Sequence, residues 1–276
     1  TASGAYSLYA NYAGAYNTAS GYSSLYSNTT GTYNTASGHS SLYLNTTGHS
    51  NTATGFDSLY ANSTGHSNTA SGFQTLNSNT IGYRNTASGY QSLWYNTSGY
   101  YNAASGYRSL FNNTTGNFNT ASGSNALFVN STGLENTAVG YNALNKNTTA
   151  NYNAAIGSWA LFNNTTGENN LALGSSALYS NTVGLGNMAL GGNALYLNTT
   201  GINNTGVGAY AGYANQTGSN NVFLGRGAGL FETGSNKLYI TGNTIRPLLY
   251  GVFSETASPN KLGIGQNTVP AGDAIM

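Results

Sequence analysis

The sequence predicts an all-β chain folded as a parallel β-solenoid, in which each repeat forms one coil. An Asn recurs every 17 residues from Asn17 to Asn221, without insertion or deletion. A fixed period of this length is typical of solenoids, whose units bury their apolar faces only by stacking on neighbours. Each unit also carries two Gly and two segments that are too short for helices. We therefore expect about fourteen stacked coils.

Five positions of the repeat are nearly constant when the opening Asn is counted as position 1. They are Ala at 3, Gly at 5, Leu at 9, Asn at 12 and Gly at 15, with Ala150 as the exception at 15. Two Gly in each unit suit turns that need a positive φ. Positions 1–4 and 8–12 are rich in Thr, Tyr, Leu and Asn and predict two strands of about four residues in each coil.

Stacking in register brings equal side chains about 4.8 Å apart, so the constant positions should form ladders. The predicted Asn ladder at position 12 contains Asn28, Asn45, Asn62, Asn79 and Asn96, and the Leu ladder at position 9 contains Leu25, Leu42 and Leu59. The position-12 Asn also begins many Asn-x-Ser/Thr sequons. We interpret these sequons as a by-product of the ladder spacing, and the alternative is a sugar coat along one side.

Two positions change in character beyond about residue 125. Position 8 turns from Ser to Ala, as at Ala126, and position 4 turns from Ser or Thr to an aliphatic residue, as at Val139 and Ile156. We expect the later coils to bury more apolar surface and to be the more stable ones.

The array is predicted to span residues 1–235, with a partial first repeat and two degenerate last repeats, the final one fifteen residues long. Residues 236–276 contain all three Pro and the apolar runs LYI, PLLYGVF and LGIG. They predict a short β segment that caps the array and leads into a downstream region. Because the chain begins inside a repeat, we expect it to be a piece of a longer protein.

Composition argues against several classes of partner. The chain is 39% hydrophobic and 5% charged, carries a net charge of +1 and has no Cys. So small a charge gives no field for nucleic acid or an anionic membrane surface, and we expect neither partner. No run approaches the roughly 20 apolar residues of a membrane span, so we expect no membrane insertion within this sequence.

Candidate catalytic groups are sparse, and we expect no enzymatic activity, metal or cofactor. The three His are His39, His49 and His66, and the only acid near them is Asp57. A zinc site takes three or four ligands, which this arrangement does not supply. No Ser occurs with a repeating His and acid arrangement, so nucleophilic catalysis has no support.

The candidate binding residues are the aromatic side chains at position 10, which alternate with the Leu at position 9 and should therefore face outward. They are Tyr26, Tyr43, Tyr60, Trp94, Phe111, Phe128, Tyr179 and Tyr196. Such a row either packs between subunits or forms a flat aromatic strip that stacks on the sugar rings of a cell-surface glycan.

Several stretches carry a family resemblance. The units NTAVGYNALNKNTTANY and NLALGSSALYSNTVGLG, and the later segments NKLYI, PLLYGVFS and NKLGIG, resemble bacterial and phage tail-fibre-like proteins that often end in a self-cleaving chaperone domain. More distantly, the Asn-to-Gly strand is similar to the head repeats of trimeric autotransporter adhesins, which form a trimeric left-handed parallel β-roll of shorter period. The resemblance implies a homotrimer that is extracellular, on a cell surface or in a virion tail fibre.

The expected function is that of a fibre shaft or head that mediates adhesion or attachment to a cell-surface glycan. One alternative is a self-assembling extracellular filament or matrix protein, and another is an ice-binding solenoid built on Thr ladders. Against ice binding, the adjacent Thr29 and Thr30 should face opposite ways, and Thr18 has no second outward Thr beside it.

Overall fold

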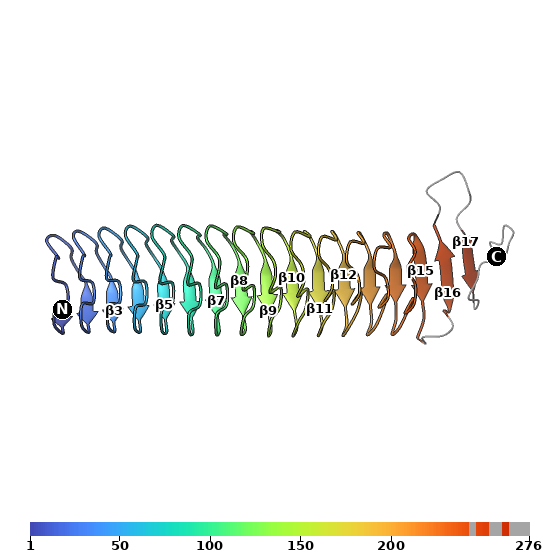
Figure 1. Cartoon of the computed structure of the whole chain (residues 1–276), viewed down its shortest axis with the longest axis horizontal. Coiled ribbons are helices and arrows are strands. Elements are labelled where there is room, and N and C mark those ends of the chain that lie inside the picture. The colour runs from blue at the N-terminus through green and yellow to red at the C-terminus, as the bar shows by residue number, and fades with distance from the viewer. Residues whose placement is uncertain (243–246, 254–260, 265–276) are drawn as a thin grey trace. The chain divides into compact units, whose positions relative to one another are not determined.

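The computed structural model describes residues 1–242, 247–253 and 261–264, which contain strands and turns and no helix. They form a parallel β-solenoid with coils of 17 residues, which confirms the predicted fold class (Figure 1). The chain divides into two compact units, unit 1 at residues 1–139 and unit 2 at residues 140–276.

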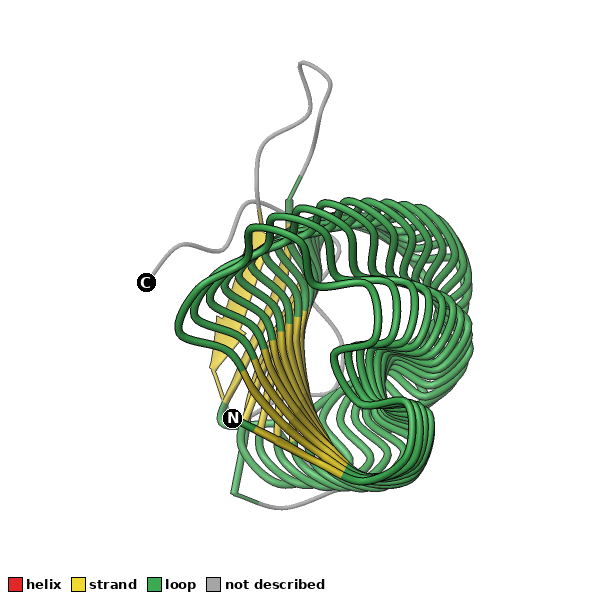
Figure 2. Cartoon of the chain, turned by 90° about the vertical axis from the view of Figure 1, so that its left-hand side faces the viewer, coloured by secondary structure: helices red, strands yellow, loops and turns green. Residues whose placement is uncertain are grey.

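Unit 1 has one short strand in each coil, at positions 2–4 of the repeat. The strands are β1 (Ala2–Ser3), β2 (Thr18–Ser20), β3 (Thr35–Ser37), β4 (Thr52–Thr54), β5 (Thr69–Ser71), β6 (Thr86–Ser88), β7 (Ala103–Ser105), β8 (Thr120–Ser122) and β9 (Thr137–Val139). Each strand pairs with the next in parallel and in register, so that Ala19 lies opposite Ala36. The strands lie along one side of the coil, and loops and turns form the rest (Figure 2).

The core of each coil is narrow and consists mainly of the predicted Ala and Leu rows. Ala19 is 1% exposed and Leu25 is fully buried, and both rows continue in this way through the unit. In β2 to β8 the central residue is buried and its two neighbours are exposed. This alternation follows from strand geometry, in which successive side chains point to opposite faces.

The predicted second strand at positions 8–12 is wrong, because this segment folds as turns. Residues at positions 7 and 9 have a left-handed backbone, with φ of 54° at Ser23 and 51° at Leu25. An extended strand excludes these angles. The Ser23 N–H donates to the Ala5 carbonyl of the preceding coil and the Leu25 N–H to the Ser41 carbonyl of the following coil, each at 2.9 Å. Bonds to both neighbouring coils hold this backbone in place.

The two Gly positions have different physical causes. Position 5 has a positive φ, as predicted, with +133° at Gly38. The Gly at position 15 has no positive φ, so the prediction of a positive φ at both Gly positions is wrong there. A Cβ on Gly48 would lie 2.5 Å from the Gly65 carbonyl oxygen and 2.7 Å from Asn62 Nδ2. Gly48 therefore has almost no room for a side chain, whereas the coil that contains Ala150 accommodates a buried methyl group at the same position.

The predicted Asn ladders are present and buried. At position 12, Asn45 Nδ2 donates to Asn28 Oδ1 at 2.7 Å and to the Gly48 carbonyl at 3.0 Å. A second ladder runs along position 1, where the Asn51 N–H donates to Asn34 Oδ1 at 3.0 Å. Each Asn thus bonds to its own coil and to the coil before it. These bonds satisfy polar groups that water cannot reach.

The sequons at position 12 lie in the Asn ladder, where their Asn side chains are buried. The Asn28 side chain is 0% exposed, and its amide donates to Asn11 Oδ1 and to the Gly31 carbonyl. A glycan on this nitrogen would replace one donated hydrogen and has no space beside the next coil. The folded ladder supports the interpretation of the sequons as structural.

Unit 2 continues the same repeat and ends in an antiparallel segment. Its strands are β10 (Ala154–Ile156), β11 (Leu171–Leu173), β12 (Met188–Leu190), β13 (Thr205–Val207), β14 (Val222–Leu224), β15 (Lys237–Ile240), β16 (Leu249–Val252) and β17 (Lys261–Ile264). β10 to β15 pair in parallel, whereas β15 to β17 pair antiparallel. The two runs predicted as strand-like, LYI and PLLYGVF, correspond to β15 and β16, and the following LGIG overlaps β17, which the prediction did not name as a strand. Pro259, Pro270 and the residues after Ile264 lie outside the described part.

The last coil differs from the prediction in length and closes the core with one large side chain. The Lys237 N–H bonds to Asn221 Oδ1 across 16 residues, so this coil is one residue longer than predicted.

Phe223 replaces the usual Ala at position 3 and is fully buried. A Cβ on Gly212 would lie 2.7 Å from Phe223 Cε2. Gly therefore replaces the usual Leu there because Phe223 fills its space.

The aliphatic residues at position 4 do not add to the core of unit 2. Ile156 is 40% exposed and Leu173 is 44% exposed, because position 4 lies on the outer face of the strand. The expectation that both changed positions bury more is therefore wrong for position 4. At position 8, Ala160 is fully buried, as Ser24 and Ser41 are in unit 1, so the change there replaces a buried hydroxyl group by a hydrogen atom and leaves the exposed fraction unchanged.

Candidate binding surface

Two rows of aromatic rings run along the outside of unit 1. The row at position 6 contains Tyr22, His39, Phe56, Phe73, Tyr90 and Tyr107. Adjacent rings stack with centroids 5.0–5.3 Å apart and planes within 19° of parallel. The exposed fraction in this row runs from 41% at Phe73 to 51% at Tyr22.

The row at position 10 contains the predicted candidate residues, and the structure places them at the surface in a half-buried state. In unit 1, Tyr9, Tyr26, Tyr43 and Tyr60 stack at 5.0–5.1 Å. Asn77 interrupts this row before Trp94, Phe111 and Phe128. In unit 2, Phe162, Tyr179, Tyr196 and Tyr213 stack at 5.1–5.4 Å. The expected outward direction, opposite to the buried Leu row, is confirmed.

The stacking determines which parts of the aromatic rings a ligand can reach. Each ring covers the face of the next, because the planes of Tyr43 and Tyr60 lie only 3° apart. Within a row, ring edges and phenol oxygens therefore point outward, whereas ring faces are covered. A sugar ring binds best to an aromatic face, so the rows do not form the flat stacking strip expected from the sequence.

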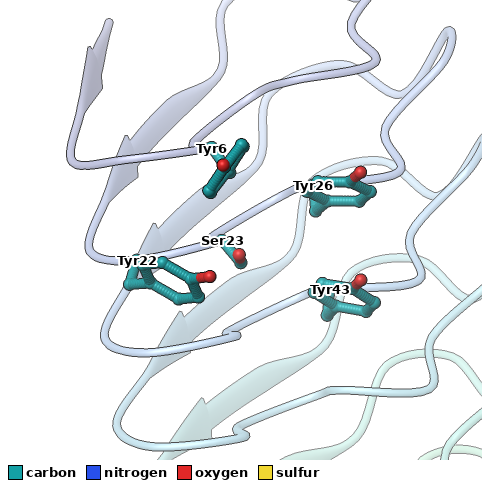
Figure 3. A pocket seen from close by; sticks show the side chains of 5 residues that line it. All are labelled: Tyr6, Tyr22, Ser23, Tyr26 and Tyr43. Carbon is teal, nitrogen blue, oxygen red and sulfur yellow. The ribbon is translucent and has the colours of Figure 1, made fainter.

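Between the two rows, at the first coils of unit 1, lies an open hollow of ≈ 350 Å³, which we call the aromatic groove. It is lined by Tyr6, Tyr22, Ser23, Tyr26 and Tyr43, so its walls are rings at positions 6 and 10 (Figure 3). Its floor is position 7, where Ser23 is 5% exposed and Ser40 in the next coil is 6% exposed. No pattern in the sequence indicates this groove, because position 7 varies freely.

Tyr6 lies across the end of the aromatic groove and turns its ring the other way. Its plane makes 84° with Tyr22 at 5.7 Å and 65° with Tyr9 at 6.0 Å. Tyr6 is 54% exposed, so its ring is open to a ligand. In unit 2, Trp159 occupies the same position 7 and meets Phe162 at 4.7 Å and 62°. Position 7 therefore accepts a ring set crosswise to the stacked rows.

Farther along unit 1, position 7 carries a chain of hydrogen-bonded polar side chains. Gln91 Nε2 donates to Gln74 Oε1 at 3.1 Å, and Arg108 Nε donates to Gln91 Oε1 at 2.9 Å. In the row at position 10, partial burial raises the pKa of Tyr60, and the neighbouring Tyr43 and Asp57 raise it further. The Tyr60 phenol therefore stays protonated at neutral pH and can donate a hydrogen bond.

A third stack lies at position 16, where the period places His49 and His66 above one another. His49 and His66 stack at 4.8 Å with planes 4° apart, and Tyr83 and Tyr100 extend the row. Partial burial lowers the pKa of His66, and the nearby His49 and Arg84 lower it further. Among the described residues, no three His, Cys, Asp or Glu side chains are grouped so that they could hold a metal ion.

The fold and this surface define a β-solenoid repeat protein with outward aromatic rows. No family model, curated protein or solved structure matches the chain. Among the described residues, no helix has the length and apolar character needed to span a membrane. The resemblance to tail-fibre and adhesin repeats stays a prediction. We therefore propose a function from the geometry of the surface.

Proposed function

We propose that this chain is a non-catalytic adhesion segment of an extracellular fibre, and that it attaches to extended glycans through the aromatic groove. The observation that carries the proposal is the aromatic groove, which has aromatic walls and a polar floor, together with the aromatic rows that continue from it coil by coil. Aromatic rings with a few placed polar groups are typical of ligand sites. Repetition allows contacts that are weak individually to add up along a polymer.

The geometry suggests how a sugar chain would lie. One pyranose ring stacks on Tyr6, while Ser23 and the phenols of Tyr22 and Tyr26 border the same hollow (Figure 3). The next sugars follow the floor, because the coil spacing of about 4.8 Å is close to the length of a sugar residue in an extended chain. This arrangement replaces the flat strip with a groove as the site of attachment.

Filling the aromatic groove tests the proposal. We expect Ser23→Trp combined with Ser40→Trp to abolish glycan binding, because the indoles would occupy the floor as Trp159 does in unit 2. Removing one ring in Tyr6→Ala should weaken binding roughly fivefold, as expected for an aromatic contact of about 1 kcal/mol. Binding of residues 1–276 to a glycan array and to the selected polysaccharide in solution provides the measurement.

The control is Tyr33→Ser, which removes an exposed Tyr outside the aromatic groove. Tyr33 is 60% exposed and stacks on Tyr16 at position 17, where Ser50 and Ser67 occur naturally. This variant should bind as the unchanged chain does. Full glycan binding by the filled-groove variant would disprove the groove as the site.

We further propose that the fibre is a homo-oligomer, associated through the strand face of unit 2. This face carries Ile156, Leu173 and Leu224, which are 40%, 44% and 43% exposed. In-register pairing places Ile156 beside Leu173, and Leu190 and Val207 continue the row to Leu224. An exposed apolar strip of this kind usually marks an interface. The homotrimer implied by the family resemblance is the state that we propose.

Substituting residues that the repeat itself uses tests the association. Unit 1 carries Ser at position 4 in most coils, so we expect the triple variant Ile156→Ser, Leu173→Ser, Leu190→Ser to fold and to lose the oligomer. Sedimentation equilibrium should give a concentration-independent trimer for the unchanged chain and a monomer for the variant. Val183→Thr, at exposed position 14, is the control that should stay trimeric. A monomeric unchanged chain would refute the trimer, and open-ended growth would favour the filament alternative.

A further inference from the structure

The strand face of unit 1 is a regular array of hydroxyl groups. In β2 to β8, positions 2 and 4 both point outward on either side of the buried Ala. The outward hydroxyl residues are Thr18, Thr35, Thr52, Thr69, Thr86 and Thr120 at position 2, and Ser20, Ser37, Thr54, Ser71, Ser88, Ser105 and Ser122 at position 4. Thr18 has no second outward Thr in its strand, as expected from the sequence, but Ser20 supplies a second outward hydroxyl.

These hydroxyls are free to bind something outside the chain. No side-chain hydrogen bond to another described residue involves Thr52, Thr69 or Ser71, and all three side chains are exposed. By contrast, Thr46 at position 13 donates its hydroxyl to the Ser63 carbonyl at 3.0 Å. The face also carries no charged side chain from β2 to β8. It is therefore neutral and hydroxylated, with apolar methyl groups wherever Thr occurs.

The spacing of the array is set by the parallel sheet. Neighbouring strands lie about 4.8 Å apart, and residues two apart in a strand lie about 6.6 Å apart. Parallel pairing in strict register, as between Thr52 and Thr69, keeps the rows straight along the sheet. The result is a near-rectangular lattice whose two repeats approach those of water oxygens on a prism face of hexagonal ice.

We propose that the strand face β2–β8 binds ice. Its hydroxyls would hydrogen-bond to lattice waters, while the Thr methyl groups hold intervening waters in place. Successive strands are turned slightly relative to one another (Figure 2), as β-sheets normally are, so only a few adjacent coils match the lattice at once. Modest ice-growth inhibition is therefore the expected activity. Because this face is separate from the aromatic groove, the inference does not depend on glycan binding.

Ice-recrystallisation inhibition and thermal hysteresis of residues 1–276 test the proposal. We expect the unchanged chain to keep ice grains small during annealing and to show hysteresis above that of buffer. Thr69→Tyr should remove most of this activity, because a ring in the middle of the array keeps the face away from the ice plane. Thr64→Tyr is the matched control: Thr64 is exposed at position 14, off the strand face, where Ile81 occurs in the next coil.

Circular dichroism should show equal melting of both variants, so that loss of activity is not loss of fold. The proposal is overturned if the unchanged chain neither inhibits recrystallisation nor shows hysteresis. It is also overturned if Thr69→Tyr keeps full activity. A filled aromatic groove, as in Ser23→Trp with Ser40→Trp, should leave ice binding unchanged, which separates this function from glycan attachment.

Discussion

Replacing Gly38 by Ala is expected to disrupt the coils around it and to lower the free energy of unfolding by about 3–5 kcal/mol. Gly38 has a φ of +133°, which side chains rarely adopt, and an added Cβ would lie 2.5 Å from the carbonyl oxygen of Gly55. The Gly55 backbone cannot move away, because it packs in the same manner against Gly72. Both backbone strain and a steric clash oppose the substitution.

Urea denaturation of residues 1–276 followed by circular dichroism measures this loss. The matched control is Ser40→Gln in the same coil. Ser40 also has a positive φ, of 52°, but Gln74 and Gln91 take the same position in later coils with the same φ. We expect the control to change the free energy of unfolding by less than about 1 kcal/mol. A similarly small loss for Gly38→Ala would show that the coils can separate locally.

The period of the sequence was sufficient to predict the stack, its buried rows and its Asn ladders. A period without insertions forces equal residues into contact, so the Asn at position 12 had to meet other Asn. The second strand could not be rejected in this way, because Leu25 has a positive φ although Leu does not mark such a backbone. Hydrogen bonds to neighbouring coils impose that conformation, and these bonds are a property of the stack.

The candidate surface was predicted in direction but not in shape. Alternation predicted Tyr26 outside and Leu25 inside, which is the observed arrangement, but the segment folds as turns and Ser24 is buried beside Leu25. The same alternation, applied to Thr18, Ala19 and Ser20, would have predicted the hydroxyl face and the exposure of aliphatic residues at position 4 in unit 2. The coil spacing is close to the distance between the centroids of stacked aromatic rings. This spacing also implies that rings at the same position of successive coils cover one another's faces. The aromatic groove depends on the turn at position 7, which the sequence does not indicate.

Removing one amide from the position-12 ladder should be almost as costly as the Gly substitution. Asn62 Nδ2 donates to Asn45 Oδ1 at 2.7 Å and to the Gly65 carbonyl at 2.9 Å, and Asn62 Oδ1 accepts from Asn79 Nδ2 at 2.8 Å. Asn62→Ala removes the amide that bonds to Asn45 Oδ1, to the Gly65 carbonyl and to Asn79 Nδ2. Each buried group that loses this partner costs about 1–3 kcal/mol. We expect a total loss of about 3–5 kcal/mol in the free energy of unfolding.

A double-mutant cycle with Asn79→Ala distinguishes a ladder from a set of independent residues. Each single variant breaks the bond between Asn62 and Asn79, so the double variant should lose clearly less than the sum of the two single losses. Asn77→Tyr is the control, because position 10 carries Tyr in other coils and lies outside the ladder. Strict additivity would contradict the coupling. The expected shortfall would instead show that each Asn stabilises the fold through its neighbours, which explains why the repeat keeps Asn at this position.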